Sequence, residues 1–163
     1  MNEINIVTMK TEREAQRVSQ FFLSEQSFDD QRHTPGEIEH FRNKPLESLG
    51  LQTHQHWYVE NEEGEIVGAI SVTENEHKTG GYLWDYIVVR KDYRKRGIAN
   101  RLYETLLEFV KSQKGRYILT YTCDLEEYST IRRIFHERGF EHIGSYPDYY
   151  YEGEGRMAFL KKL

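Results

Sequence analysis

Cysteine, proline and long hydrophobic runs are all scarce in this sequence. Among 163 residues there are three prolines and a single cysteine, Cys123, so an internal disulfide is excluded and a reducing compartment such as the cytoplasm is expected. No apolar run approaches the roughly 18 residues that a membrane helix needs, and no basic and apolar leader pattern opens the sequence. We therefore expect a cytoplasmic protein that has no membrane partner.

Positive charge is also in deficit. Lys and Arg number 22 against 27 Asp and Glu, which gives a formal net charge of −5. General nucleic-acid binding usually needs a basic face, so a nucleic-acid partner is not expected. The 37 % hydrophobic and 30 % charged content is typical of a globular chain. Its length fits one domain that spans residues 1–163.

Apolar periodicity and turn residues predict an alternation of seven strands and four helices. The strands are expected at residues 3–9, 56–60, 66–72, 82–89, 116–123, 140–144 and 155–161. The helices are expected at residues 12–24, 35–44, 97–112 and 130–138, and the second of them should end before Pro45. The turn at residues 61–65 predicts a hairpin. This order indicates an α+β fold, a mixed antiparallel and parallel sheet with helices on both faces.

The most informative segment runs from Tyr82 to Leu102. An apolar strand ends at Val89, a turn follows in which five of the eight residues 90–97 are Lys or Arg, and a helix begins near Gly97. The first turn of a helix has backbone N–H groups without internal partners, and glycine allows close approach of a ligand. The pattern therefore predicts a pyrophosphate site. It contains neither a G-x-G-x-x-G nor a G-x-x-x-x-G-K-[ST] motif.

The turn Arg94-x-x-Gly97-x-Ala99 after an apolar strand resembles the acetyl-CoA-binding segment of the GNAT (Gcn5-related) N-acetyltransferases, and the element order is similar over nearly the whole chain. The resemblance implies a GNAT-like fold, acetyl-CoA as the acetyl donor, no metal, and direct attack by an amine in a ternary complex. Dimers are common among relatives, so a homodimer is also expected. The cofactor contacts that it implies are Ile87, Val88, Val89, Arg94, Lys95, Arg96, Gly97, Ile98, Ala99, Asn100, Tyr128 and Phe135.

Asp85 is the candidate for handling the proton of the amine. Period-2 alternation places Asp85 on one face of its strand, with Trp84 and Tyr86 on the other. A carboxylate within an apolar strand is unfavourable unless it is paired or functional. In many GNAT enzymes an acidic residue at this place acts as the base or orients the acceptor. The alternatives are a structural Asp85 bound by backbone or tyrosine donors, Glu74 or Glu76 acting through water, and His77, which is expected in an exposed turn.

The fourth helix departs from the family pattern, which is roughly N-x-x-A-x-x-h-Y-x-x-x-G-F. With Gly139-Phe140 fixing the register, Tyr128 falls on the Asn position and Phe135 on the Tyr position. Phe135 cannot donate a proton to the thiolate of CoA. Tyr128 is the candidate donor, and water or release of an unprotonated thiolate are the alternatives. This departure motivates a second hypothesis, a catalytically weak module that binds or senses acyl-CoA.

Tyrosines dominate the C-terminal part, where four occur in the six residues 146–151. We expect this run to line the acceptor pocket; packing of the last strand pair or a dimer surface are the alternatives. The candidate acceptor contacts are Trp84, Asp85, Tyr121, Tyr149 and Tyr150. Cys123 ends an apolar strand and is expected to be a buried structural thiol rather than a nucleophile. Neither the acceptor amine nor a role for residues 24–55 can be read from the sequence.

Overall fold

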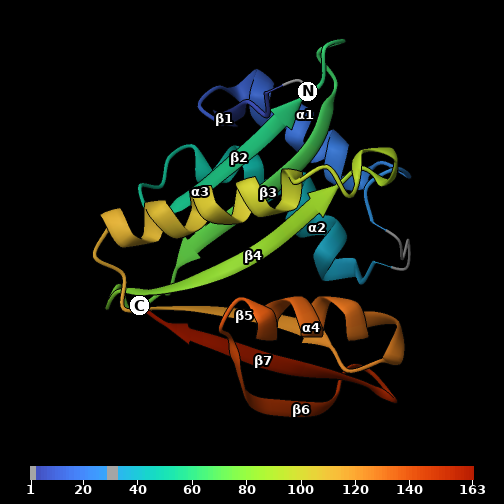
Figure 1. The fold of residues 1–163 in the computed structure, drawn as a ribbon, viewed down its shortest axis with the longest axis vertical. Helices are drawn as coiled ribbons and strands as arrows, with labels where there is room; N and C mark the ends of the chain where they lie inside the picture. Colours follow the sequence, from blue (N-terminus) through green and yellow to red (C-terminus); the bar gives the residue numbers. More distant parts are fainter. Residues whose placement is uncertain (1–2, 29–32) are drawn as a thin grey trace. The chain divides into compact units, whose positions relative to one another are not determined.

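The computed structural model describes residues 3–28 and 33–163 (Figure 1). Its strands are β1 (Ile6–Thr8), β2 (His54–Glu60), β3 (Ile66–Glu74), β4 (Gly81–Val89), β5 (Tyr117–Cys123), β6 (Glu141–Tyr151) and β7 (Glu154–Lys162). Its α-helices are α1 (Glu12–Leu23), α2 (Pro35–Ser48), α3 (Ile98–Ser112) and α4 (Ser129–Glu137), and two 3₁₀ turns are η1 (Lys91–Tyr93) and η2 (Glu126–Tyr128). The predicted element order is confirmed within these residues.

The strands follow the order β1-β2-β3-β4-β5-β7-β6. β4 and β5 pair in parallel, whereas β1 with β2, β2 with β3, β5 with β7, and β6 with β7 are antiparallel. The predicted mixed sheet and the hairpin around residues 61–65 are therefore confirmed. None of the helices within the described residues is long and apolar enough to cross a membrane.

Two compact units make up the chain. The first combines residues 1–73 with 86–109, and the second combines residues 74–85 with 110–163. β4 runs through both, because its first five residues belong to the second unit and its last four to the first. The single domain expected over residues 1–163 stays a prediction.

In the first unit, helices cover both faces of the strands. α1 and α2 each begin with a capping box, in which a threonine N-cap and a glutamate three residues later bond reciprocally. Their apolar faces meet through Phe22 and Phe41, whose ring centroids are 5.2 Å apart. On the other face, α3 packs directly on β3, because a Cβ at Gly68 would lie only 2.9 Å from Ile98 Cγ2. Trp57 of β2 meets Phe109 of α3 on this same face, at 5.2 Å.

In the second unit, α4 lies over β5 and β7 (Figure 1). Phe135 of α4 packs against Trp84 at 5.3 Å, Phe159 at 5.4 Å and Phe140 at 5.9 Å between ring centroids. All four side chains are at most 4 % exposed. This aromatic cluster fixes which residues of β4, β5 and β7 face α4 and which face the opposite way.

The prediction that the second helix ends before Pro45 is wrong, because α2 continues to Ser48. Proline removes the hydrogen bond that an N–H at this position would make to the carbonyl of Phe41. Pro45 and Ser48 are both buried, and the Ser48 hydroxyl donates to the carbonyl of Pro45 at 2.8 Å. Only one turn follows the proline, so the burial of Pro45 and Ser48 offsets the single lost backbone bond.

Candidate functional site

The first backbone N–H groups of α3 have no hydrogen-bond partner within the helix. Gly97 has φ +84° and its carbonyl accepts the N–H of Arg101 at 3.1 Å. The N–H groups of Ile98, Ala99 and Asn100 therefore precede the first intrahelical bond and have no partner inside the helix. The first turn of α3 contains no acidic residue, so no side-chain carboxylate competes for these donors. Donors of this kind at a helix N-terminus are suited to binding an anion.

Basic side chains surround this turn, but they differ in what they contact. Lys95 is exposed and has φ +62°. Arg96 lies over the ring of Tyr93 at 4.6 Å and donates to the carbonyl of Asp92. Arg90 covers the other face of Tyr93 at 4.8 Å. Arg90 also forms ion pairs with Asp92 at 2.7 Å and with Glu65 at 3.2 Å, so its charge is neutralised locally.

Arg94 fixes the position of the turn through backbone contacts. Its Nε donates to the carbonyl of Val89 at 3.1 Å, and its Nη2 donates to the carbonyl of Ser27 at 3.2 Å. The guanidinium thus ties the end of β4 to the segment after α1. On β4 itself, Ile87 and Val89 are half-buried, whereas Val88 is buried in the cluster beneath α1 and α2. The cofactor roles of these residues stay predictions.

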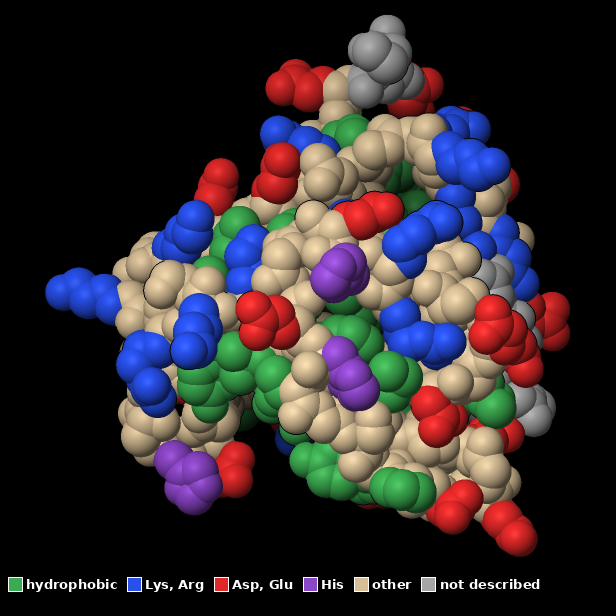
Figure 2. Space-filling view, turned by 60° about the horizontal axis from the view of Figure 1, so that its bottom comes forward, with side chains coloured by type: hydrophobic (Ala, Val, Ile, Leu, Met, Phe, Trp, Pro, Cys, Tyr) green, Lys and Arg blue, Asp and Glu red, His purple; other side chains and the backbone are tan. Residues whose placement is uncertain are grey.

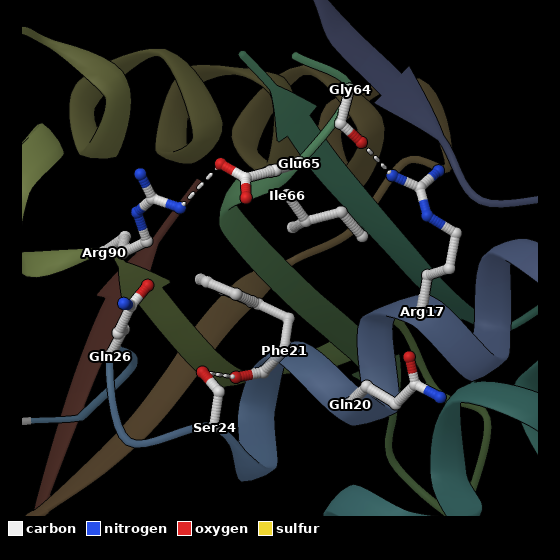
Figure 3. Close-up of a pocket in the computed structure, with 9 residues that line it drawn as sticks. All are labelled: Arg17, Gln20, Phe21, Ser24, Gln26, Gly64, Glu65, Ile66 and Arg90. Carbon is white, nitrogen blue, oxygen red and sulfur yellow. Dashed lines mark hydrogen bonds and ion pairs between the residues drawn. The ribbon is translucent and has the colours of Figure 1, made fainter.

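A shallow groove lies beside this turn, between α1, the β2–β3 turn and Arg90 (Figure 3). Its two arginines are both engaged. Arg17 donates to Glu60 at 2.7 Å and to the carbonyl of Gly64 at 2.6 Å, and Arg90 pairs with Glu65. A hydrogen bond from Asn61, followed by the hydrogen bond and charge of Arg90, lowers the pKa of the Glu65 carboxyl. These contacts hold α1 on the hairpin, and we assign the groove a structural role.

Charges of both signs are spread over the face seen in Figure 2. A nucleic-acid surface would instead gather basic side chains on one face.

In the described part of the chain, no group of three or more His, Cys, Asp or Glu side chains is arranged to hold a metal ion.

Asp85 is half-buried on β4 and lies in the second unit. The parallel ladder aligns Gly81–Leu83 with Tyr117–Leu119. Because side chains alternate along each strand, Asp85 points to the same face as Leu83, Leu119 and Tyr121. Trp84 points the other way and is only 2 % exposed beneath α4. Trp84 is thus a core residue that the structure does not bring to the face of Asp85 and Tyr121.

The other candidates lie at the end of β3 and in the turn before β4. Glu74 is half-buried, and its Oε1 accepts the N–H of Gly80 at 3.3 Å. Glu76 and His77 are exposed and 3.3 Å apart, with side-chain exposures of 83 % and 76 %. They are surface residues of a turn, so Asp85 is the candidate best enclosed by the fold.

Tyr121 and Tyr149 meet at an arginine that the sequence analysis missed. Arg156 of β7 lies over the ring of Tyr121 at 3.3 Å and over that of Tyr149 at 4.7 Å. Burial raises the pKa of the Tyr121 hydroxyl, and the guanidinium opposes that rise. Tyr150 contacts Tyr149 edge to face at 5.2 Å. The tyrosine run belongs to β6, which is longer than the predicted strand at 140–144 and extends to Tyr151.

The remaining candidates lie at α4 and at the end of β5. Tyr128 is the half-buried N-cap residue of α4. Phe135 is 4 % exposed in the aromatic cluster, and contact of either residue with a cofactor stays a prediction. Cys123 is buried, as predicted, and burial raises the pKa of its thiol. A thiol in this state is a poor nucleophile.

Comparison with known proteins identifies the family. Residues 16–140 match the acetyltransferase (GNAT) family. No curated protein sequence matches the chain. Among solved structures, a GNAT-family protein from Desulfovibrio desulfuricans has a TM-score of 0.82 at 16 % identity, over 98 % of this chain and 99 % of that one. A GNAT-family acetyltransferase from Staphylococcus aureus Mu50 has a TM-score of 0.77 at 19 % identity, over 99 % of each chain.

An aminoglycoside 6′-N-acetyltransferase complexed with coenzyme A is also similar, with a TM-score of 0.75 at 16 % identity, over 99 % of this chain and 97 % of that one. At such identities the likeness to these structures shows the fold, and the family match covers more than half of the chain. The predicted GNAT-like fold and acyltransferase class are thereby confirmed: this chain belongs to the GNAT family of acetyltransferases.

Proposed function

We propose that this protein transfers the acetyl group of acetyl-CoA to a primary amine of a small molecule or peptide, by direct attack in a ternary complex. The observation that carries this proposal is the N-terminus of α3, where the N–H groups of residues 98–100 precede the first intrahelical bond, Gly97 has a positive φ, and the first turn has no acidic residue. These donors fit a pyrophosphate. One structural neighbour is named as an N-acetyltransferase in complex with coenzyme A, which supports the same chemistry.

The donor contacts that we propose are mostly backbone contacts. The N–H groups of Ile98, Ala99 and Asn100 donate hydrogen bonds to the phosphate oxygens, and Lys95 and Arg96 supply positive charge. Arg94 acts indirectly, because its bonds to two carbonyls hold the turn in place. The backbone at residues 87–89 positions the donor along β4. When bound, acetyl-CoA supplies the thioester carbonyl that the amine attacks.

Asp85 is proposed to orient the acceptor amine and to take its proton. A primary amine is mainly an ammonium ion at neutral pH, and only the neutral form attacks a carbonyl. Asp85 is a half-buried carboxylate on the face of the sheet that Tyr121 shares. A carboxylate in that setting attracts the ammonium ion and accepts its proton as the new bond forms.

The candidate that we propose for proton delivery to the departing thiolate is the hydroxyl of Tyr128, the N-cap residue of α4. Phe135 occupies the position at which family members commonly carry tyrosine, and it is buried against three aromatic rings. Release of an unprotonated thiolate is the alternative, since a thiol pKa lies only moderately above neutrality. The same observation favours the second candidate function, a catalytically weak module that binds acyl-CoA.

Cellular setting and assembly remain proposals. A single, buried Cys123 fits a reducing compartment such as the cytoplasm. We propose a homodimer on the basis of the family resemblance, and sedimentation of the purified protein measures it directly.

Acetyl transfer is tested by incubating the protein with acetyl-CoA and a panel of primary amines. Release of the CoA thiol and the mass of the acetylated amine are both measured. We expect turnover with at least one amine, and Asp85→Asn should lower kcat/KM most at low pH, where more of the amine is protonated. Cys123→Ser is the matched control and should retain turnover. CoA binding without thiol release over the whole panel would favour the acyl-CoA-binding module instead.

A further inference from the structure

Arg156 is held rigidly between two tyrosine rings on β7. Its guanidinium stacks on Tyr121 at 3.3 Å and lies over Tyr149 at 4.7 Å. Its Nη1 also donates to the hydroxyl oxygen of Tyr149 at 2.8 Å. Tyr149 itself is 53 % exposed, so the arginine lies at an open part of the surface of the second unit. This arrangement fixes a planar donor group in one orientation.

The guanidinium contacts in the described part of the chain are with tyrosines rather than with a carboxylate. Its Nε is buried and has no hydrogen-bond partner among the described residues. Arginine stays charged at every physiological pH, and a buried donor without a partner is unfavourable. Arg90 and Arg17, by contrast, are both paired with carboxylates. Arg156 therefore combines a permanent charge, a fixed plane and an unsatisfied donor.

The strand register places this arginine on the face of the candidate base. Arg156 is opposite Cys123, and Ala158 is opposite Tyr121, in the antiparallel β5–β7 ladder. Arg156 and Tyr121 thus share one face, and Asp85 shares it through the β4–β5 register. β5 is the neighbour of both β4 and β7 (Figure 1). One face of the second unit therefore carries a carboxylate on β4 and an uncompensated cation on β7.

We propose that Arg156 binds a carboxylate of the acceptor, so that the acceptor class is an amine that also carries a carboxylate, such as a small amino acid. This inference rests on the proposed acetyl transfer. A guanidinium fork binds a carboxylate through two parallel hydrogen bonds. The ammonium end of the same molecule is complementary to Asp85. A polycationic amine would instead bring a second positive charge to Arg156.

The acceptor class is tested with matched pairs of straight-chain ω-amino acids and n-alkylamines of equal length. We expect kcat/KM to favour the amino acid of at least one pair by roughly 10- to 100-fold, the ratio that a charge-assisted hydrogen bond supports. Arg156→Gln should abolish this preference, and Arg156→Lys should restore only part of it because lysine lacks the fork. Arg133→Gln removes an equal charge from an exposed position of the same unit and should leave the preference intact.

A binding measurement separates failure of this inference from failure of acetyl transfer. The Nε–H resonance of Arg156 is assigned by its loss in Arg156→Lys and followed by NMR during titration with the same ω-amino acids and alkylamines. A shift that saturates with an amino acid but not with its alkylamine supports the carboxylate site, even if no amine is acetylated. Turnover with no carboxylate preference, or an unmoved Arg156 resonance, overturns the inference and leaves Arg156 as a packing residue.

Discussion

Replacing Gly97 tests whether the N-terminus of α3 binds pyrophosphate, and two substitutions of nearly equal shape separate charge from geometry. Gly97→Asn and Gly97→Asp both add a side chain at φ +84°. The nearest heavy atom to an added Cβ is Ile4 Cδ1 at 3.9 Å, so steric crowding is absent. Asparagine and aspartate both cap helix N-termini well. The pair thus differs mainly by one negative charge at the proposed phosphate position.

The expected effect on folding is similar for both variants. The left-handed backbone conformation costs about 1–2 kcal/mol for a residue other than glycine, and an Asn or Asp N-cap is better than a Gly N-cap by only about 0.3 kcal/mol. Both variants should therefore be destabilised by about 1 kcal/mol, and by nearly the same amount. For ligand binding, two unit charges about 5 Å apart repel by about 3 kcal/mol at an effective dielectric constant of about 20. Solvent screening at this exposed turn reduces that to about 1–2 kcal/mol, or roughly 5- to 30-fold in Kd.

Calorimetric titration with acetyl-CoA measures this difference directly. We expect Gly97→Asp to bind roughly 5- to 30-fold more weakly than Gly97→Asn, and the ratio to shrink as salt is added. Urea unfolding of both variants checks that they are equally folded. Equal affinities for acetyl-CoA in the two variants at low salt would refute the reasoning, because the added charge would then lie away from the phosphates.

Three further predictions concern buried groups. Burial, and then the charges of His54 and His40, hold the pKa of His56 well below its usual value. The free energy of unfolding should therefore fall as pH drops below about 6.5, by up to about 1.4 kcal/mol per pH unit. The urea midpoints measured at pH 7 and pH 5.5 should differ less in His56→Phe than in the wild type. Phe135→Tyr buries a hydroxyl among aromatic rings and should destabilise by about 1–3 kcal/mol in thermal unfolding without raising kcat; higher turnover would contradict this. Cys123 should react with a thiol reagent only as fast as the protein opens, and rapid labelling of the native protein would show the thiol to be accessible.

The parts of the fold that the sequence predicted are those whose signals are local. Thr11 with Glu14, and Thr34 with Glu37, form the capping boxes of α1 and α2, and each lies within four consecutive residues. The turn before α3 is equally local, since Gly97 has the positive φ that its residue type favours. The alternation along β4 correctly separated Trp84 from Asp85, because the pleat of a strand has a fixed period.

Long-range packing explains what the sequence analysis missed. Pro45 was expected to end α2, yet the turn that follows it holds the buried Ser48, whose hydroxyl meets His56 of β2 in a tertiary contact that no local pattern contains. The same is true of the end of β6, where a register shift between Tyr146 and Tyr151 against β7 accommodates the tyrosine run in the strand.

Arg156 shows why the acceptor is harder to read than the donor. The donor turn consists of consecutive residues, and backbone N–H groups bind phosphate whatever the side chains are. An acceptor surface is made of side chains from separate strands. Arg156 and Tyr121 are 35 positions apart and become neighbours only through the β5–β7 register. In the sequence, Arg156 is one of 22 basic residues. What distinguishes it is that two tyrosines hold it, whereas Arg17 and Arg90 meet carboxylates, and that difference exists only after folding.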